Sequence, residues 1–335
     1  MKRYTKASSS DAVTLREQEN LRIAYQAACE GMVLLQNDGA LPFRTKKIAL
    51  YGPGASMTIK GGTGSGEVNE RHSVTVLEGL QNRGFEITTR KWIEDFEQGY
   101  REAYEAYQVE KRKRINLLKL NDIMQMLLDN FKAPVGRPIT EDDVRASDTD
   151  CCIYVLSRQA GEGGDRKVEQ GDFCLTEVEK EAIRFCAAHY DKFVLAINCG
   201  SSIDMSFADE IPGINAIIYL CQLGTEGGHA FADVVSGKVT PSGKLTDTWA
   251  KSYDQIPFGE SYSSRGGNPK VAENREGIFV GYRYFDPFGI EPAYPFGFGL
   301  GYTDFSIHSA GVMAEGGEVT VKAMVKNVGQ AFSGK

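Results

Sequence analysis

Apolar residues along the first 250 positions follow two alternating patterns. Short runs are apolar at nearly every position, as in CCIYVLSR, and the segments between them carry apolar residues every three or four positions, as in LTEVEKEAIRFCAAH. Unbroken apolar runs are typical of parallel strands buried on both faces, and the second spacing is that of an amphipathic helix. The runs that we interpret as strands lie at 48–54, 85–90, 151–158, 192–200, 214–224 and 244–250.

This alternation predicts an α/β fold over residues 14–250. We expect an open three-layer α/β sandwich around a mostly parallel sheet of about six strands, too few for an eight-stranded barrel. Helical spacing between Thr14 and Gln36 predicts a first helix over that range. Residues 92–148 are long, charged and helical in pattern, and we interpret them as a helical insert.

The character of the chain changes after residue 250. Residues 251–303 are rich in Gly, Pro, Tyr and Phe, which predicts an irregular aromatic segment packed on the sandwich domain rather than disorder. From Phe305 onward apolar positions alternate, as in EVTVKAMVKNVG, which is typical of strands. Because two or three strands are not stable alone, residues 304–335 are interpreted as an incomplete β-sandwich, the truncated start of a further domain.

Composition and charge narrow the function classes. The 335 residues include 38 Lys and Arg against 45 Asp and Glu, and this net charge of -7 argues against a nucleic-acid or membrane partner. Seven cysteines without a CxxC pair favour free thiols in a reducing compartment. Neither a secretory signal nor a membrane-spanning apolar stretch is visible, so a cytoplasmic protein is predicted. The four histidines lack metal-ligand spacing, and no metal or other cofactor is expected.

Two glycine-rich segments follow predicted strands. They are IKGGTGSGE at 59–67 and AGEGGDR at 160–166. In open α/β sheets ligands bind beyond the carboxyl ends of the strands, and dense glycines allow the backbone to approach a ligand closely. Neither segment has the Gly-Lys-Ser/Thr ending of a phosphate loop or a GxGxxG fingerprint, so nucleotide binding is a weak hypothesis. Glu162 stands between glycines, and from the pattern alone a loop carboxylate without function is as good an interpretation as a catalytic one.

Six stretches, in this order, resemble the α/β sandwich domain of glycoside hydrolase family 3, the β-glucosidase type. The tail from 318 to 335 is similar to the opening of the fibronectin-III-like domain that follows it in this family. The resemblance covers about residues 14–335. The stretches are EGMVLLQNDGALPF (30–43), IKGGTGSGEVN (59–69), AGEGGDRKVEQGDFCLTEVE (160–179), LGTEGGHAFADVVSGKVTPSGKLTDTW (223–249), REGIFVGYRYFD (275–286) and YPFGFGLGYTDF (294–305).

The resemblance implies a retaining glycosidase that works with two carboxylates. The nucleophile of the family is an aspartate on a separate (β/α)8 barrel, and its acid/base residue corresponds to Glu162. The same resemblance places Ser65, flanked by Thr63 and Gly64, against the sugar. We interpret Asp165 and Arg166 as residues that order the loop.

The expected substrates are β-linked glycosides or oligosaccharides, from whose ends the enzyme removes terminal sugars. A β-glucosidase is the first interpretation of this activity. A β-xylosidase-type specificity and a non-catalytic module that binds sugar or docks on a barrel stay open as alternatives. The barrel itself is missing from this sequence, so the chain alone is expected to be inactive. The sequence leaves open the oligomeric state and whether a barrel precedes or follows in the gene.

Overall fold

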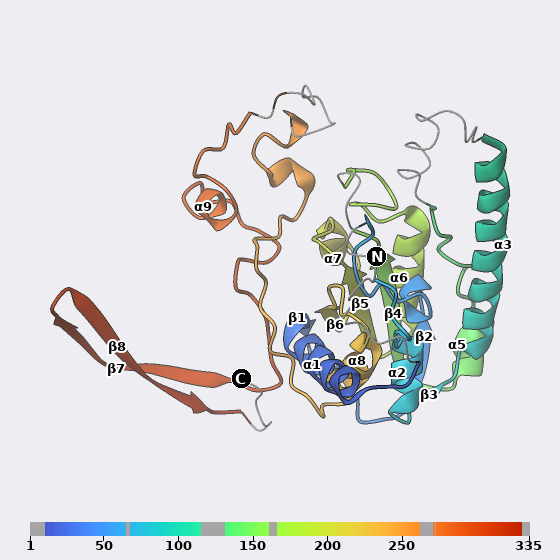
Figure 1. Ribbon diagram of the computed structural model, residues 1–335, viewed down its shortest axis with the longest axis horizontal. Coiled ribbons are helices and arrows are strands. Elements are labelled where there is room, and N and C mark those ends of the chain that lie inside the picture. Colours follow the sequence, from blue (N-terminus) through green and yellow to red (C-terminus); the bar gives the residue numbers. More distant parts are fainter. Residues whose placement is uncertain are drawn as a thin grey trace, which may run out of the picture.

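A computed structural model describes residues 11–64, 68–114, 131–160, 166–261, 271 and 273–329. Its centre is a six-stranded sheet in the order β1-β6-β5-β4-β2-β3 (Figure 1). All neighbouring strands are parallel except β1 and β6. The strands are β1 (Val33–Asn37), β2 (Lys47–Tyr51), β3 (Glu86–Ile87), β4 (Cys151–Arg158), β5 (Lys192–Cys199) and β6 (Ala216–Tyr219).

Helices cover both faces of this sheet, which makes three layers (Figure 1). Helices α1, α2 and α8 pack together on one face, and α3, α5 and α6 lie on the other, as right-handed crossovers require. The helices of the sandwich are α1 (Leu15–Gly31), α2 (Val76–Asn82), α3 (Arg90–Arg114), α5 (Glu141–Ser147), α6 (Glu177–His189), α7 (Ser206–Glu210) and α8 (Gly227–Val235). The predicted three-layer α/β sandwich with a mostly parallel sheet is confirmed.

The first predicted helix was too long. Helix α1 ends at Gly31, and the following four residues, Met32 to Leu35, are at most 2% exposed; the last three of them already belong to β1. Four consecutive buried apolar side chains suit an edge strand covered on both faces, whereas a helix would have turned one of them to solvent. Strand β1 runs antiparallel to β6 and adds a sixth strand that the sequence did not predict.

The predicted strand at 244–250 is wrong. Its buried residues Leu245 and Trp249 bond through their backbones to Phe298 and Tyr294 rather than to a strand of the sheet. This segment therefore fastens residues 294–298 against the sandwich. The region also contains the short helix α9 (Tyr282–Phe285).

Two glycines let α2 and α8 cross in close contact. A Cβ added to Gly228 would lie 2.8 Å from the carbonyl oxygen of Val74 and still closer to that of Thr75, and a Cβ on Gly79 would overlap the backbone of Gly228. Here the sequence needs glycine because backbone meets backbone, with no side chain between the two helices.

A hairpin of β7 (Phe305–Glu315) and β8 (Glu318–Asn327) forms a separate two-stranded antiparallel sheet that projects from the sandwich (Figure 1). The pairs Ile307–Val325 and Val312–Val321 lie on the same face. An irregularity between Ser309 and Gly311 shifts the register by one residue and so keeps the valines beyond it on that face. This apolar face is exposed, with Val321 at 66%.

Candidate active site at the carboxyl edge of the sheet

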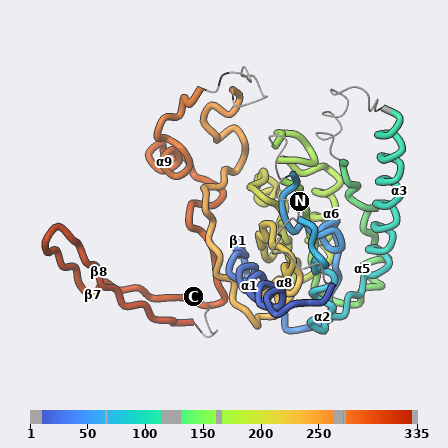
Figure 2. Tube along the Cα trace, in the orientation of Figure 1, coloured from blue at the N-terminus to red at the C-terminus, as the bar shows by residue number. Residues whose placement is uncertain are grey.

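The chain changes direction within the sheet between β2 and β4. These two strands are neighbours, but the chain leaves β2 toward β3 and leaves β4 toward β5, on the other side. Such a switch point opens a crevice beyond the carboxyl ends of the strands, where ligands bind in open α/β sheets. Segment 160–166 begins just after β4 ends at Arg158, and segment 59–67 follows β2 after the short turn at Pro53–Ala55; the carboxyl edge of the sheet lies at the top of the sandwich in Figure 2.

The turn after β2 requires a glycine. Gly52 has a φ of 89°, and a Cβ there would lie 2.5 Å from the carbonyl oxygen of Val155 in β4. The close approach of the two strands at the switch point therefore depends on an absent side chain. The turn at Gly52 directs the segment after β2 across the end of β4.

The structure describes some of the predicted site residues and not others. Thr63 is half-buried, Gly64 is exposed with a φ of 81°, and Arg166 is largely buried. Ser65, Glu162 and Asp165 lie outside the described residues.

Arg166, four residues after the predicted acid/base position, fixes the chain at that point. Its Nε pairs with the Asp172 carboxylate, its Nη2 donates to the Asp172 carbonyl oxygen at 2.9 Å, and its Nη1 donates to Ser201 Oγ at 2.5 Å. Burial disfavours the charged guanidinium, but the neighbouring Cys199 and Asp172 outweigh it and hold the pKa of Arg166 above its usual value. Arg166 therefore anchors this end of the segment as a permanent cation.

A second arginine supports the first. Arg158, at the end of β4, donates through Nη1 and Nη2 to both carboxylate oxygens of Glu179 at 2.6 Å, and through Nε to the Asp172 carbonyl oxygen at 2.9 Å. Arg158 and Glu179 are both buried, and a buried ion pair holds its geometry only when it is bidentate and further hydrogen-bonded, as here. The two arginines thus converge on Asp172.

The glycine-rich segment after β2 is held at both of its ends by Lys60. The Lys60 ammonium pairs with the Glu70 carboxylate and donates to the Val68 carbonyl oxygen at 3.2 Å. The Lys60 carbonyl oxygen accepts from the Gly224 amide at 2.8 Å. Residues 60 and 68–70, which flank in sequence the residues expected to touch sugar, are thereby drawn together.

The two glycine-rich segments meet. Gln159, which directly precedes the second, donates through Nε2 to the carbonyl oxygen of Gly61 in the first, at 3.0 Å. The structure therefore brings the described parts of both predicted site segments to one place on the sheet edge. Sequence reasoning missed Asp172, Gln159 and the buried Asn198, because a polar residue in a loop or apolar run carries no pattern of its own.

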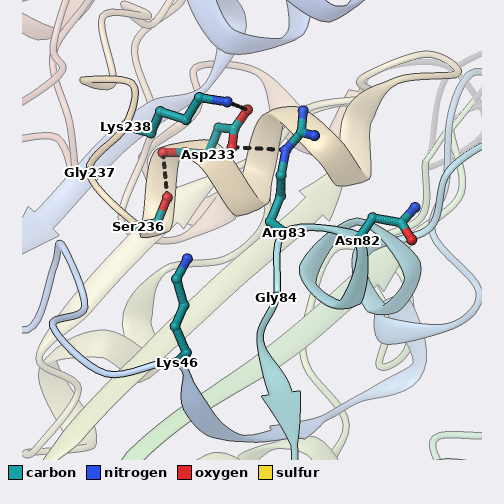
Figure 3. Close-up of a pocket in the computed structure, with 8 residues that line it drawn as sticks. All are labelled: Lys46, Asn82, Arg83, Gly84, Asp233, Ser236, Gly237 and Lys238. Carbon is teal, nitrogen blue, oxygen red and sulfur yellow. Dashed lines mark hydrogen bonds and ion pairs between the residues drawn. The ribbon is translucent and has the colours of Figure 1, made fainter.

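A cavity of about 630 Å³ lies at the opposite, amino edge of the sheet (Figure 3). Its central carboxylate, Asp233, accepts from the Tyr25 hydroxyl at 2.5 Å and pairs with Arg83 at 2.9 Å and Lys238 at 3.1 Å. Arg83 and Lys238 follow the carboxyl ends of α2 and α8, where cations are favoured. These charges join α1, α2 and α8, and we assign the cavity a structural role.

Replacing Asp233 with Asn is expected to lower the free energy of unfolding by about 2 kcal/mol at pH 7. Burial raises the pKa of Asp233, but Tyr25, Lys238 and Arg83 outweigh it and hold that pKa below its usual value. A lowered folded-state pKa means that the ionised carboxylate stabilises the fold above the unfolded pKa of about 4, and that this stabilisation is lost as pH falls through the folded-state pKa.

Urea unfolding of both proteins between pH 7 and pH 3 checks this, and the difference is expected to shrink below about pH 4. Asp150→Asn is the matched control, because the ion pair of Asp150 with Lys192 is exposed and contributes little. A constant difference across this range would contradict the assignment.

The described ranges contain neither a metal-binding cluster nor a membrane-spanning helix. No group of three or more His, Cys, Asp or Glu in that part of the chain could hold a metal ion. None of the helices there is both long and apolar enough to span a bilayer. The seven cysteines are all free thiols.

Comparison with known proteins identifies the family of this chain. Residues 32–302 match the glycosyl hydrolase family 3 C-terminal domain. Beta-glucosidase A of Butyrivibrio fibrisolvens is 31% identical over 323 residues, which cover 86% of this chain and 35% of that protein. A beta-glucosidase of Ruminococcus albus is 32% identical over 325 residues, covering 93% of this chain and 31% of that one. The chain thus spans about a third of the length of these relatives.

A solved structure shows the same fold. Beta-glucosidase 3B from Thermotoga neapolitana, in complex with alpha-D-glucose, superposes with a TM-score of 0.76 at 32% identity. The match covers 94% of this chain and 43% of that one. Fold, switch-point site and relatives agree, and the chain belongs to glycosyl hydrolase family 3, of which it carries the C-terminal domain.

Proposed function

We propose that this chain is the acid/base domain of a retaining, exo-acting β-glucosidase, which removes terminal β-linked glucose from oligosaccharides or glycosides. The observation that carries the proposal is the meeting of both glycine-rich segments at the switch point of a family 3 sheet. Glucose is favoured over xylose as the sugar because the relatives are named beta-glucosidases and one solved neighbour holds glucose.

The proposed chemistry divides between two carboxylates. Glu162 protonates the leaving oxygen and later activates water, while an aspartate of a (β/α)8 barrel attacks the sugar carbon. A general acid must be protonated near neutral pH, and burial against a barrel together with a nearby carboxylate would raise the pKa of Glu162 accordingly. Ser65, with Thr63 and Gly64, contacts the sugar, and Asp165 and Arg166 order the acid/base segment.

An exposed apolar surface supports a docking partner such as the barrel. Within the irregular segment, Ile278, Phe288 and Phe296 are 72%, 57% and 54% exposed. This segment, with α9, rises beside the carboxyl edge of the sheet (Figure 1). Large apolar side chains that are exposed in one segment beside a candidate active site are typical of a surface that another domain covers.

The isolated chain is expected to show no substantial hydrolysis of 4-nitrophenyl β-D-glucoside, because it lacks a nucleophile. The enzyme that joins this chain to a barrel is expected to hydrolyse that substrate and to release the β-anomer of glucose first. Absorbance assays of both proteins and proton NMR of the released sugar test this. Efficient turnover by the pure 335-residue chain, or release of the α-anomer first, would contradict the proposal.

A further inference from the structure

Asn198 occupies an unusual place for an amide. It lies in β5, one residue before the strand ends, and it is fully buried in a strand whose other buried residues are all apolar. Its Oδ1 accepts from the Ile59 amide at 2.6 Å, and its Nδ2 donates to the carbonyl oxygens of Ile59 at 3.0 Å and Cys221 at 2.8 Å. Both donors and the acceptor oxygen are therefore used, and every partner is backbone.

The Asn198 side chain supplies the hydrogen bonds to backbone that a neighbouring strand would otherwise supply. Both backbone groups of Ile59 are bonded, so the first residue of the glycine-rich segment is held at the carboxyl end of β5, although it belongs to no strand. A buried amide is costly unless it is satisfied, and an aliphatic side chain would fill the same volume more cheaply. The role of the Asn198 amide is therefore to hold the segment in position, and not merely to fill the core.

A second amide joins the two segments. Gln159 is exposed, and its Nε2 donates to the carbonyl oxygens of Gly61 and Ala160, both at 3.0 Å. Gln222, just beyond Cys221, donates to the same Ala160 oxygen at 3.0 Å. The chain that enters the acid/base segment is thus tied to the sugar-binding segment and to the residues after β6.

We propose that Asn198 is a positioning residue, which with Gln159 sets residues 59–61, at the start of the sugar-binding segment, in place relative to residues 159–160, which lead into the acid/base segment. This inference rests on the proposed glycosidase function and adds to it the residues that align the two halves of the site. Neither amide needs to touch substrate. Alignment of this kind matters because a shift of about 1 Å can cost about 100-fold in rate.

The test compares Asn198→Ala with Asn215→Ala in the enzyme that joins this chain to a barrel. Asn215 is a matched control, because its Oδ1 accepts from the Phe193 amide at 2.8 Å, at the opposite end of the same pair of strands. Melting temperatures report the structural cost of each change. We expect kcat/KM of Asn198→Ala to fall by about 100-fold, and that of Asn215→Ala to match the unsubstituted enzyme.

The leaving group separates positioning from acid catalysis. The loss in Asn198→Ala is expected to be equal for 4-nitrophenyl and 2,4-dinitrophenyl β-D-glucoside, because sugar placement is needed for both. Gln159→Ala provides the second variant, since an exposed side chain can be removed without endangering the fold, and a loss of about tenfold is expected. If Asn198→Ala fails to fold, the activity of Gln159→Ala alone tests the positioning role.

The outcomes distinguish the inference from the function on which it rests. Equal kcat/KM for Asn198→Ala and Asn215→Ala, or full activity of Gln159→Ala when Asn198→Ala does not fold, overturns the positioning role. If Glu162→Gln in the same enzyme remains fully active, the proposed function fails whatever the amides do. A slow Glu162→Gln enzyme beside an unaffected Asn198→Ala enzyme leaves the function standing and rejects only the positioning role.

Discussion

Glu162→Gln, made in the enzyme that joins this chain to a barrel, is expected to lower kcat/KM for 4-nitrophenyl β-D-glucoside by about 100- to 10,000-fold. The amide can neither protonate the leaving oxygen nor activate water. The loss should be much smaller in the first step with 2,4-dinitrophenyl β-D-glucoside, because its leaving group departs without a proton. Steady-state kinetics on both substrates measure the difference.

Azide provides an independent readout of the same role. It attacks the sugar–enzyme intermediate without needing a general base, so it should restore turnover of the good substrate and yield β-glucosyl azide. Glu169→Gln is the matched control, because Glu169 is a loop carboxylate close in sequence and its ion pair with Lys132 is exposed. If both variants were equally active, Glu162 would have no acid/base role.

Gly228→Ala is expected to destabilise the sandwich by about 3 kcal/mol. The new methyl group meets the carbonyl oxygens of Val74 and Thr75, which are backbone atoms and have no rotamer that would move them aside. Helices α2 and α8 must then separate, and the contacts that Asp233 makes between them are strained as well. Urea unfolding followed by circular dichroism gives the change in free energy.

Gly99→Ala is the control for helix propensity. Gly99 lies inside α3, and a Cβ there would have no atom within 4 Å. This variant is expected to raise stability by about 0.5 to 1 kcal/mol, because alanine loses less conformational freedom on folding. A Gly228→Ala protein as stable as Gly99→Ala would show that α2 and α8 do not depend on their close crossing.

The sheet could be predicted because buried parallel strands leave an unmistakable pattern. CCIYVLSR and KFVLAINC have no period of two, so they read as strands covered on both faces. Strand β1 was not predicted, because Met32 and Leu35 also fit the helical period of the residues before them. Residues 244–250 misled because Leu245 and Trp249 are buried by loop pairing with 294–298 rather than by a sheet.

The candidate site, too, has features that the sequence predicted and features that it did not. Glycine density and position after a strand mark both segments, and the family likeness singles out Glu162 among their carboxylates. What joins the segments could not be predicted, because the partners of Asn198 are backbone groups 139 and 23 residues away in the chain. An asparagine in an apolar run has the same sequence signature whether it holds an active-site loop or satisfies a local turn.

The apolar face of the β7–β8 hairpin has a consequence for handling the protein. Valines in register along an exposed two-stranded ribbon offer a template on which further chains can add strands. Lys322 and Lys326 lie on the opposite face of β8 and leave the apolar one without a charge to deter stacking. Preparations in which nothing covers this face are therefore prone to self-association and loss of solubility as concentration rises, however stable the sandwich beside it.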